Sequence, residues 1–207
     1  MDNLLTTSAI EKITPFLVNV GGAFVIYASQ NQSIRFRSLN KQYVYYLIEG
    51  EVDMHREVDD LLILTMRAPK ILGLSLLHSD DCFHYMKTTR NSKLIAIEQT
   101  HFRELIETHN LWKEVFTITS SMVKSYFRRD ERFYSKNVYD VIKNNLEILW
   151  DSPPLERKKT SIFKYILSRS DMSRSSLSKV LKDLNDGGYI TISRGKLLNI
   201  KSLPDRY

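Results

Sequence analysis

The sequence is poor in cysteine, in long apolar runs and in leader-like features, and each shortage excludes a class of protein. One cysteine, Cys82, among 207 residues cannot form an internal disulfide, and a single thiolate cannot hold a zinc ion or an iron–sulfur cluster. No stretch approaches the roughly 18 apolar residues that span a bilayer. The opening MDNLLTTSAI has no basic segment leading into an apolar one. We therefore expect a cytoplasmic protein without disulfides or membrane spans.

Catalytic signatures are also scarce. A metal-dependent oxygenase would need two histidines and a carboxylate at close spacing, but His55, His78 and His84 have no such neighbours. His78 and His84, six residues apart, leave a metal or haem site as an alternative that the sequence does not favour. No nucleophile elbow, glycine-rich phosphate loop or acid pair stands out. The sequence predicts no enzyme, no catalytic residue, no metal and no cofactor.

Positive charge is concentrated in the last third of the chain. Residues 1–135 hold 16 lysines and arginines and 16 acidic residues, whereas residues 136–207 hold 14 and 8. The last third therefore accounts for the whole net charge of +6. A basic segment attached to a neutral one is typical of a protein that binds a polyanion through its tail. A lysine-rich solvated surface would have the same composition, so charge alone does not decide between the two.

The first hundred residues predict an antiparallel barrel. An opening amphipathic segment, 4–17, is followed after Gly21 and Gly22 by short runs rich in β-branched and aromatic residues. The runs are 24–27, 33–36, 43–54, 61–66, 70–74, 85–89 and 93–98. They recur about every ten residues between turn-forming breaks, which is typical of a compact barrel or jelly roll.

Helical periodicity replaces this pattern after Thr100. A short helix is predicted at 101–109 and a long one from Asn110 to Tyr134. The long helix carries a narrow apolar seam at steps of three and four residues, weakened by one arginine: Leu111, Val115, Ile118, Met122, Tyr126, Arg129 and Phe133. The first five are the candidate dimer contacts. Such a stripe packs either on its own barrel or on the same helix of a second subunit. We favour a homodimer, because the features of the last third also call for two-fold symmetry.

The last third reads as a small helical domain after a hinge near Ser135–Asn137. A helix is predicted at 138–150, and the Asp-Ser-Pro-Pro stretch at 151–154 ends it. A basic loop, ERKKT (156–160), follows. Two short helices are then predicted at 161–169 and 173–184, separated by a tight turn.

The helix at 173–184 has two contrasting faces. Ser173 is a plausible N-cap, and an apolar stripe recurs at i, i+3, i+4 and i+7: Leu177, Val180, Leu181 and Leu184. The opposite face carries small or cationic hydrogen-bonding groups: Ser175, Lys179 and Lys182, flanked by Arg174 and Ser178. A helix enters the major groove of DNA with such side chains, because arginine and lysine pair with guanine while serine reaches phosphate.

A glycine stop and a basic hairpin follow this helix. Asn185-Asp186-Gly187-Gly188 tolerates left-handed geometry, and ITIS-RG-KLLNI (190–200) predicts a hairpin with Arg194-Gly195 at its tip. Two short helices at a tight turn and a hairpin with basic residues make a winged helix-turn-helix. Each feature is weak alone, but the ordered series is specific.

These motifs resemble the CRP/FNR-type bacterial transcription regulators over nearly the whole chain. YVYYLIEGEVDM resembles the family's barrel strands, with Ile48, Gly50 and Val52 in the core pattern. THFRELIETHN resembles its barrel-closing helices, and SRSSLSKVLKDLNDGGYI its recognition helix. More loosely, the chain resembles the enterobacterial group described as inhibitors of hydrogen-peroxide resistance. The resemblance implies an α+β protein: a cyclic-nucleotide-binding-like β jelly roll (1–109), a dimerisation helix and hinge (110–135) and a winged helix-turn-helix (136–207).

The sequence departs from the family where cyclic nucleotides bind. Nucleotide-binding members have a Gly-Glu pair and then an Arg-Ser pair, whereas here Leu74 follows Gly73 and His84-Tyr85 takes the place of Arg-Ser. Without its counter-charge a cyclic phosphate loses roughly 3–5 kcal/mol. We therefore expect no cyclic AMP. The segment is either filled by its own side chains or binds an apolar ligand such as an acyl chain. The candidate contacts are Leu72, Leu74, Phe83, His84 and Tyr85.

The sequence thus predicts a homodimeric regulator that binds double-stranded DNA. The resemblance places Arg174, Ser175 and Lys179 against base edges. The remaining basic residues of the domain would contact phosphates: Arg157, Lys158, Lys159, Arg169, Lys182, Arg194 and Lys196. RNA polymerase is a further candidate partner. The alternative is a sensor or interaction module that acts through protein partners, but acidic or apolar residues would then be expected on the recognition face.

Overall fold

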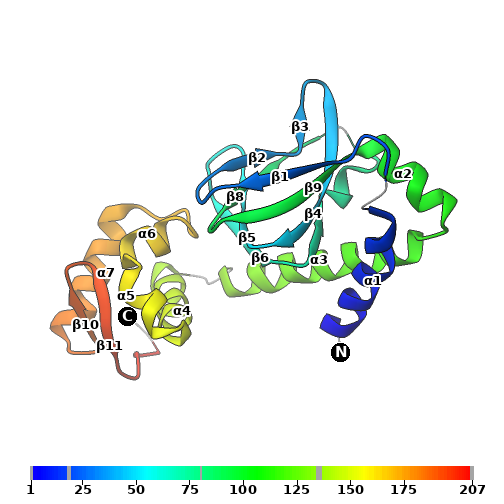
Figure 1. Ribbon diagram of the computed structural model, residues 1–207. Helices are drawn as coiled ribbons and strands as arrows, with labels where there is room; N and C mark the ends of the chain where they lie inside the picture. Colours follow the sequence, from blue (N-terminus) through cyan, green and yellow to red (C-terminus); the bar gives the residue numbers. More distant parts are fainter. Residues whose placement is uncertain (1, 18–19, 80, 134–136, 206–207) are drawn as a thin grey trace. The chain divides into compact units, whose positions relative to one another are not determined.

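The computed structural model describes residues 2–17, 20–79, 81–133 and 137–205, and side chains except those of residues 2–3 and 130–133. It divides into two compact units, Met1–Phe127 and Arg128–Tyr207 (Figure 1). The boundary falls inside the long helix α3 (Trp112–Phe133). The hinge expected near Ser135 falls mostly outside the described residues. Within the described ranges, no helix is both long enough and apolar enough to cross a membrane.

Two antiparallel sheets form the barrel of the first unit. One sheet has the strand order β1-β9-β4-β3, with β7 also paired to β4, and the other has the order β2-β8-β5-β6. The strands are β1 (Phe24–Ala28), β2 (Ser33–Arg35), β3 (Arg37–Ser38), β4 (Lys41–Glu49), β5 (Glu51–Arg56), β6 (Leu62–Arg67), β7 (Lys70–Leu72), β8 (His84–Thr88) and β9 (Ser92–Glu98). The predicted jelly-roll fold is confirmed.

The run at 43–54 forms two strands that lie in different sheets, and they separate at Glu49-Gly50, one of the turn-forming breaks in the sequence. Gly50 separates β4 from β5 with a φ of 99°, a backbone conformation that favours glycine. A Cβ at Gly50 would lie 2.2 Å from Ser92 Oγ. The chain therefore passes from one sheet to the other at a position where only glycine fits.

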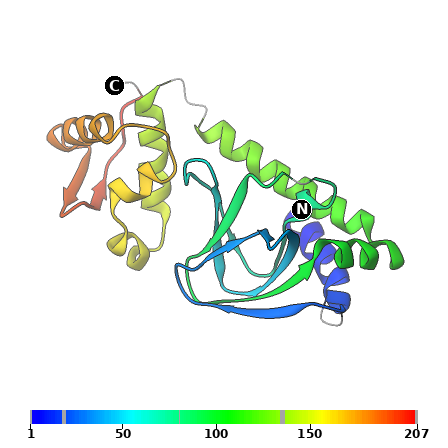
Figure 2. The same ribbon diagram turned by 90° about the horizontal axis from the view of Figure 1, so that it is seen from above.

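Strand β4 is buried on both faces, which explains its unbroken apolar sequence. Tyr45 and Leu47 point into the core between the two sheets. Val44 and Tyr46 point into a second core, beneath the helices. The helices of this unit are α1 (Asp2–Leu17), α2 (Gln99–Thr108) and α3, with a short 3₁₀ turn, η1, at Leu74–Leu76. Figures 1 and 2 show α1 and α3 side by side against the barrel.

The second unit is a helical domain with a two-stranded hairpin. Its elements are α4 (Val138–Asp151), α5 (Pro154–Lys159), α6 (Ile162–Leu167), α7 (Arg174–Asp186), β10 (Ile190–Ser193) and β11 (Lys196–Ile200). One apolar core joins α4, α6, α7 and the hairpin. The winged helix-turn-helix predicted from the order of elements is confirmed.

The basic segment 156–160, predicted as a loop, is mostly helical. Helix α5 begins at Pro154, where proline's fixed φ suits the first helical position and its missing N–H has no partner to lose. The proline pair therefore ends α4 and starts another helix at once. Asn145 of α4 is fully buried in this core and donates through Nδ2 to the Val141 carbonyl at 2.8 Å.

Candidate nucleic-acid interface

The N-terminus of α7 is fixed by a cluster of serine hydroxyls. Ser173 caps the helix, and its Oγ accepts the Ser176 backbone N–H at 3.1 Å. The same oxygen lies 2.9 Å from Ser175 Oγ and 2.8 Å from Ser176 Oγ. The cap sets where the helix begins, as the sequence predicted, and thereby which side chains occupy its first turn.

Helix α7 separates a buried stripe from an exposed polar face. The four predicted apolar residues are all in the core of the domain: Leu177, Val180, Leu181 and Leu184. The other face is exposed, and its members are Arg174, Ser175, Ser178, Lys179 and Lys182. Burial of the stripe turns the cationic face outward, since the two sets of residues lie on opposite sides of one helix.

An aromatic ring positions the first cation of this face. Arg174 Cζ lies 5.1 Å from the centroid of the Phe163 ring, which belongs to α6. A guanidinium near a ring face is attracted by the ring quadrupole and keeps its hydrogen-bond donors available. The helix that precedes the turn therefore supports the side chain at the start of the helix that follows it.

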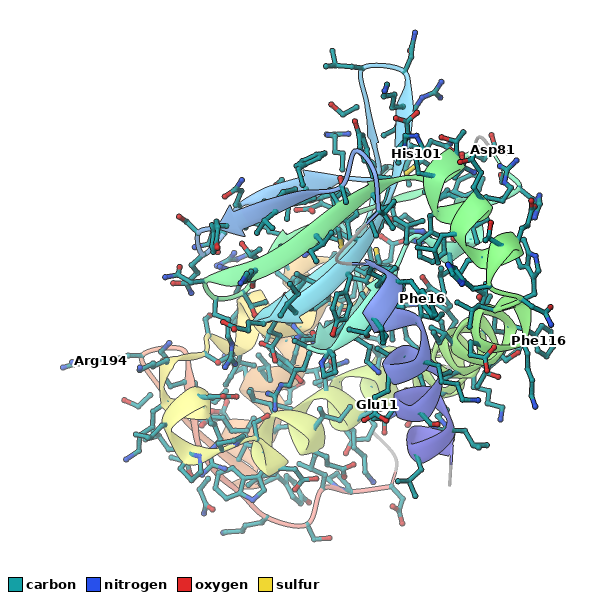
Figure 3. The ribbon with its side chains drawn as sticks, turned by 45° about the vertical axis from the view of Figure 1, so that its right-hand side comes forward. Glu11, Phe16, Asp81, His101, Phe116 and Arg194 are labelled. Carbon is teal, nitrogen blue, oxygen red and sulfur yellow. The ribbon has the colours of Figure 1, made fainter. Side chains whose placement is uncertain are left out.

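The hairpin presents a basic tip tied to the helices. Arg194 and Gly195 both have positive φ, 49° and 72°, as in a two-residue type I′ turn. The Gly195 carbonyl accepts the Ile162 N–H at 3.0 Å, which anchors the tip to the start of α6. The Arg194 side chain is exposed and extends away from the domain (Figure 3). Lys196 Nζ instead donates to the Lys159 carbonyl.

Two arginines that were expected to contact phosphates instead pack on aromatic rings of their own domain. Arg157 Cζ lies 3.9 Å from the centroid of the Trp150 ring, and Arg157 Nη1 donates to the Trp150 carbonyl. Arg169 Cζ lies 3.8 Å from the centroid of the Tyr165 ring, and Arg169 Nη1 donates to the Tyr165 carbonyl at 3.2 Å. Their guanidinium groups are thus held against their own domain. Lys158 and Lys159 of the same basic segment are exposed.

Sequence reasoning missed these aromatic platforms and one further cation. The four-residue spacing of Tyr165 and Arg169 was a signal that could have revealed one pair. The Trp150–Arg157 pair joins two helices across a proline turn, and no spacing rule reveals it. Lys164 of α6, exposed in the structure, also adds positive charge to the helix-turn-helix.

The expected effector site in the barrel is almost filled. Beside Gly73 lies a cavity of about 50 Å³, far below the roughly 300–1,000 Å³ of small-molecule sites. It is lined by Phe36, Met54, Gly73, Ser75, Leu76, Asp81, Cys82, Phe83, His84, Met122 and Tyr126. Of the five predicted ligand contacts, only Phe83 and His84 line it.

The other three predicted contacts lie elsewhere, so the expected ligand set is not one site. Leu72 is in the core between the sheets and Leu74 in the core beneath the helices. Tyr85 stacks on His55, with ring centroids 5.4 Å apart, and donates to Asp60. The prediction took a run of apolar residues as one lining, whereas strand alternation and the turn at η1 send them to different faces.

The groups that line the cavity beside Gly73 do not suit a cyclic phosphate. Burial lowers the pKa of His84, and nearby Arg56 lowers it further, so the imidazole is neutral at pH 7. Asp81, in contrast, adds a carboxylate to the lining. Among the described residues, no group of three histidine, cysteine or acidic side chains is placed to hold a metal ion.

The predicted dimer seam of α3 faces its own barrel. Leu111, Val115 and Ile118 are buried in the core beneath the helices, and Met122 packs against the core between the sheets. Periodicity found an apolar stripe but could not identify what covers it. A second apolar face remains exposed, with Phe116 73%, Val123 43% and Phe127 65% exposed. Figure 3 shows Phe116 on the outer side of the helix.

Comparisons with known proteins agree with this architecture. Residues 138–205 match the family model described as winged helix-turn-helix DNA binding. A curated relative described as "Inhibitor of hydrogen peroxide resistance", from Escherichia coli (strain K12), is 28% identical over 180 residues, which cover 86% of each chain.

Solved structures show the same fold at lower sequence identity. The global regulator CLP of Xanthomonas campestris, described as responsive to c-di-GMP, has a TM-score of 0.70 at 18% identity, covering 95% of this chain and all of that one. A CRP/FNR-family transcriptional regulator from Thermus thermophilus has a TM-score of 0.60 at 18% identity, covering 84% of this chain and 92% of that one. The predicted resemblance is confirmed.

Proposed function

We propose that this chain, which has the fold of the CRP/FNR regulators and a winged helix-turn-helix domain, is a homodimeric transcription regulator that binds specific DNA sequences without cyclic AMP. The observation that carries the proposal is the exposed face of α7. It is cationic and rich in donors on a helix whose other face is fully buried. That combination suits a major groove, which admits one helix and presents acceptors at each guanine.

The exposed residues divide into two roles. Arg174, Ser175 and Lys179 occupy the first turns of α7, the part of a recognition helix that reaches base edges. Lys182, further along α7, and Arg194 at the hairpin tip would hold phosphates, together with Lys158 and Lys159. Arg157 and Arg169 belong instead to the support of the domain, because their guanidinium groups pack on Trp150 and Tyr165.

The homodimer is supported by the exposed face of α3. Phe116, Val123 and Phe127 recur at steps of seven and four residues, so they form one stripe on the helix. Exposed aromatic side chains gathered on one helix are typical of a surface that another subunit covers. Two α7 helices in such a dimer would enter successive major grooves, about 34 Å apart, on a near-palindromic site.

Cyclic AMP is expected to leave the protein unchanged. The cavity beside Gly73 is nearly filled, and a neutral His84 and the carboxylate of Asp81 stand where a phosphate needs a positive counter-charge. Isothermal titration calorimetry with cyclic AMP should therefore give no binding heat, and the melting temperature should not change. A control titration with operator DNA verifies that the same preparation is active. Micromolar binding of cyclic AMP would contradict this account of the barrel.

Replacing Arg194 by alanine is expected to weaken binding to all DNA sequences by the same factor. The side chain lies at the hairpin tip and reaches phosphate rather than bases, so operator and random duplexes should lose similar affinity. The slope of log affinity against log salt should become shallower by about one unit. Fluorescence anisotropy across a salt series measures both. Thr191→Ala, on the same hairpin but uncharged, is the matched control, and a loss confined to the operator would contradict the assigned role.

A further inference from the structure

The first unit also contains a groove that is separate from the cavity beside Gly73. Its volume is about 490 Å³, within the roughly 300–1,000 Å³ of small-molecule sites. Three elements form it: α1, the turn from β6 to β7, and the middle of α3, which lie together on one side of the barrel (Figures 1 and 2). All of its lining residues belong to the first unit.

The lining combines an apolar floor with hydroxyl groups. The apolar members are Leu64, Met66, Ala68, Pro69, Ile71, Ile118 and Met122. The hydroxyl members are Thr6, Thr7, Thr65, Ser121 and Ser125. A ligand with an apolar body would bury side chains such as Leu64 and Met122, both half-buried in the free protein. Two of the hydroxyls already have acceptors, because Thr65 Oγ1 donates to Asp53 and Ser125 Oγ donates to the Ser121 carbonyl.

The charges of the groove all have one sign. Among the described residues that line it, only Arg67 and Lys70 are charged, and none is a carboxylate. Arg67 donates to the carboxylate of Glu51, which lies outside the lining. Lys70 belongs to none of the ion pairs found between described residues. One uncompensated cation beside an apolar floor suits a monoanion with an apolar tail.

We propose that this groove binds an amphipathic monocarboxylate of the medium-chain fatty acid class, with its carboxylate at Lys70 and its chain along the apolar floor between β6 and α3. Sequence reasoning considered an acyl ligand at the segment around Gly73, where the cavity is about 50 Å³. The groove is a different site with nearly ten times that volume.

The groove stays open in the proposed dimer. At 100° per residue, Ser121 and Ser125 lie roughly 160° around α3 from the stripe of Phe116, Val123 and Phe127. A second subunit seated on that stripe would leave the opposite side of the helix uncovered. The ligand would contact the barrel and α3 together, and α3 continues across the boundary between the two units. Any effect on DNA affinity rests on the proposed function, but binding itself does not.

The proposal is tested by calorimetry on the full chain with octanoate, decanoate and dodecanoate, beside decan-1-ol and decylamine of matched length. A carboxylate is expected to bind about tenfold more tightly than the alcohol, because it adds a charge-assisted contact with Lys70. The amine is expected not to bind. Absence of binding by all three carboxylates, or equal binding of amine and carboxylate, would overturn the proposal.

Two variants locate the site. Ser121→Trp fills the groove and should abolish carboxylate binding, whereas Lys70→Gln should reduce carboxylate affinity about tenfold, to that of the alcohol. Lys113→Trp and Lys113→Gln place the same changes on an exposed position of α3 outside the groove and should bind like the parent. Circular dichroism verifies that each variant is folded. Unchanged binding by folded Lys70→Gln would assign the carboxylate to another place, against the proposal.

Discussion

The double substitution Phe116→Glu with Phe127→Glu is expected to separate the subunits and to lower the affinity for operator DNA by at least about a hundredfold. Both rings are largely exposed in the single chain, and in the proposed dimer they are buried against the partner. A buried carboxylate without a counter-charge opposes association strongly. Separated subunits bind half-sites one at a time and lose the high effective concentration that linkage provides.

Analytical ultracentrifugation and anisotropy with operator DNA test this expectation. The matched control is Phe24→Glu with Tyr27→Glu, since both side chains are exposed aromatic residues on β1 and lie outside α3. The control should remain dimeric and should bind the operator like the parent. A dimer that persists in the α3 variant would contradict the assignment of this face. The assignment would also be contradicted if the parent protein were monomeric at the concentrations at which it binds operator DNA.

Alanine at Arg174 is expected to cost about 1–3 kcal/mol per half-site, roughly fivefold to more than a hundredfold in affinity, on the operator and much less on random DNA. In the proposed complex the Arg174 guanidinium would make bidentate contacts with guanine, which an alanine side chain cannot make. Phe163→Leu keeps the charge but removes the ring near Arg174, so it should give a smaller loss in the same direction.

The measurement compares operator and random duplexes at one salt concentration for each variant. Lys158→Ala is the control, because Lys158 is an exposed cation of the same domain that is expected to touch only phosphate. Lys158→Ala should lower the affinity for both duplexes equally. Equal losses on operator and random DNA for Arg174→Ala would refute a base-reading role for that side chain.

The order of elements in the C-terminal domain was predictable because each local signal agrees with the tertiary core. Ser173 caps α7, and the stripe from Leu177 to Leu184 is buried as the 3.6-residue period requires. Arg194-Gly195 forms the tight turn that its composition favours. Local and tertiary preferences agree here, so a reading based on spacing succeeds.

The predictions failed where a tertiary partner decides the outcome. The seam of α3 was correctly recognised as apolar, but periodicity does not distinguish the chain's own barrel from a second subunit. Segment 156–160 was predicted as a loop from its charge, although Pro154 favours a helix start.

The side-chain sites were less predictable than the fold. Arg157 and Arg169 were expected at phosphates because they are basic, yet each packs on an aromatic ring of its own domain. Composition counts charge without showing where a long side chain points. The groove between α1, β6 and α3 could not be predicted, because its lining comes from three segments distant in the sequence.

Selection of genomic DNA fragments by the purified protein tests the central claim most directly. Fragments would be captured at moderate salt with heparin as competitor and then sequenced. The account predicts a limited set of enriched fragments that share a near-palindrome with half-sites about one helical turn apart, bound by a dimer. A folded protein that retains no fragment above the heparin-blocked background would contradict the claim that α7 reads DNA.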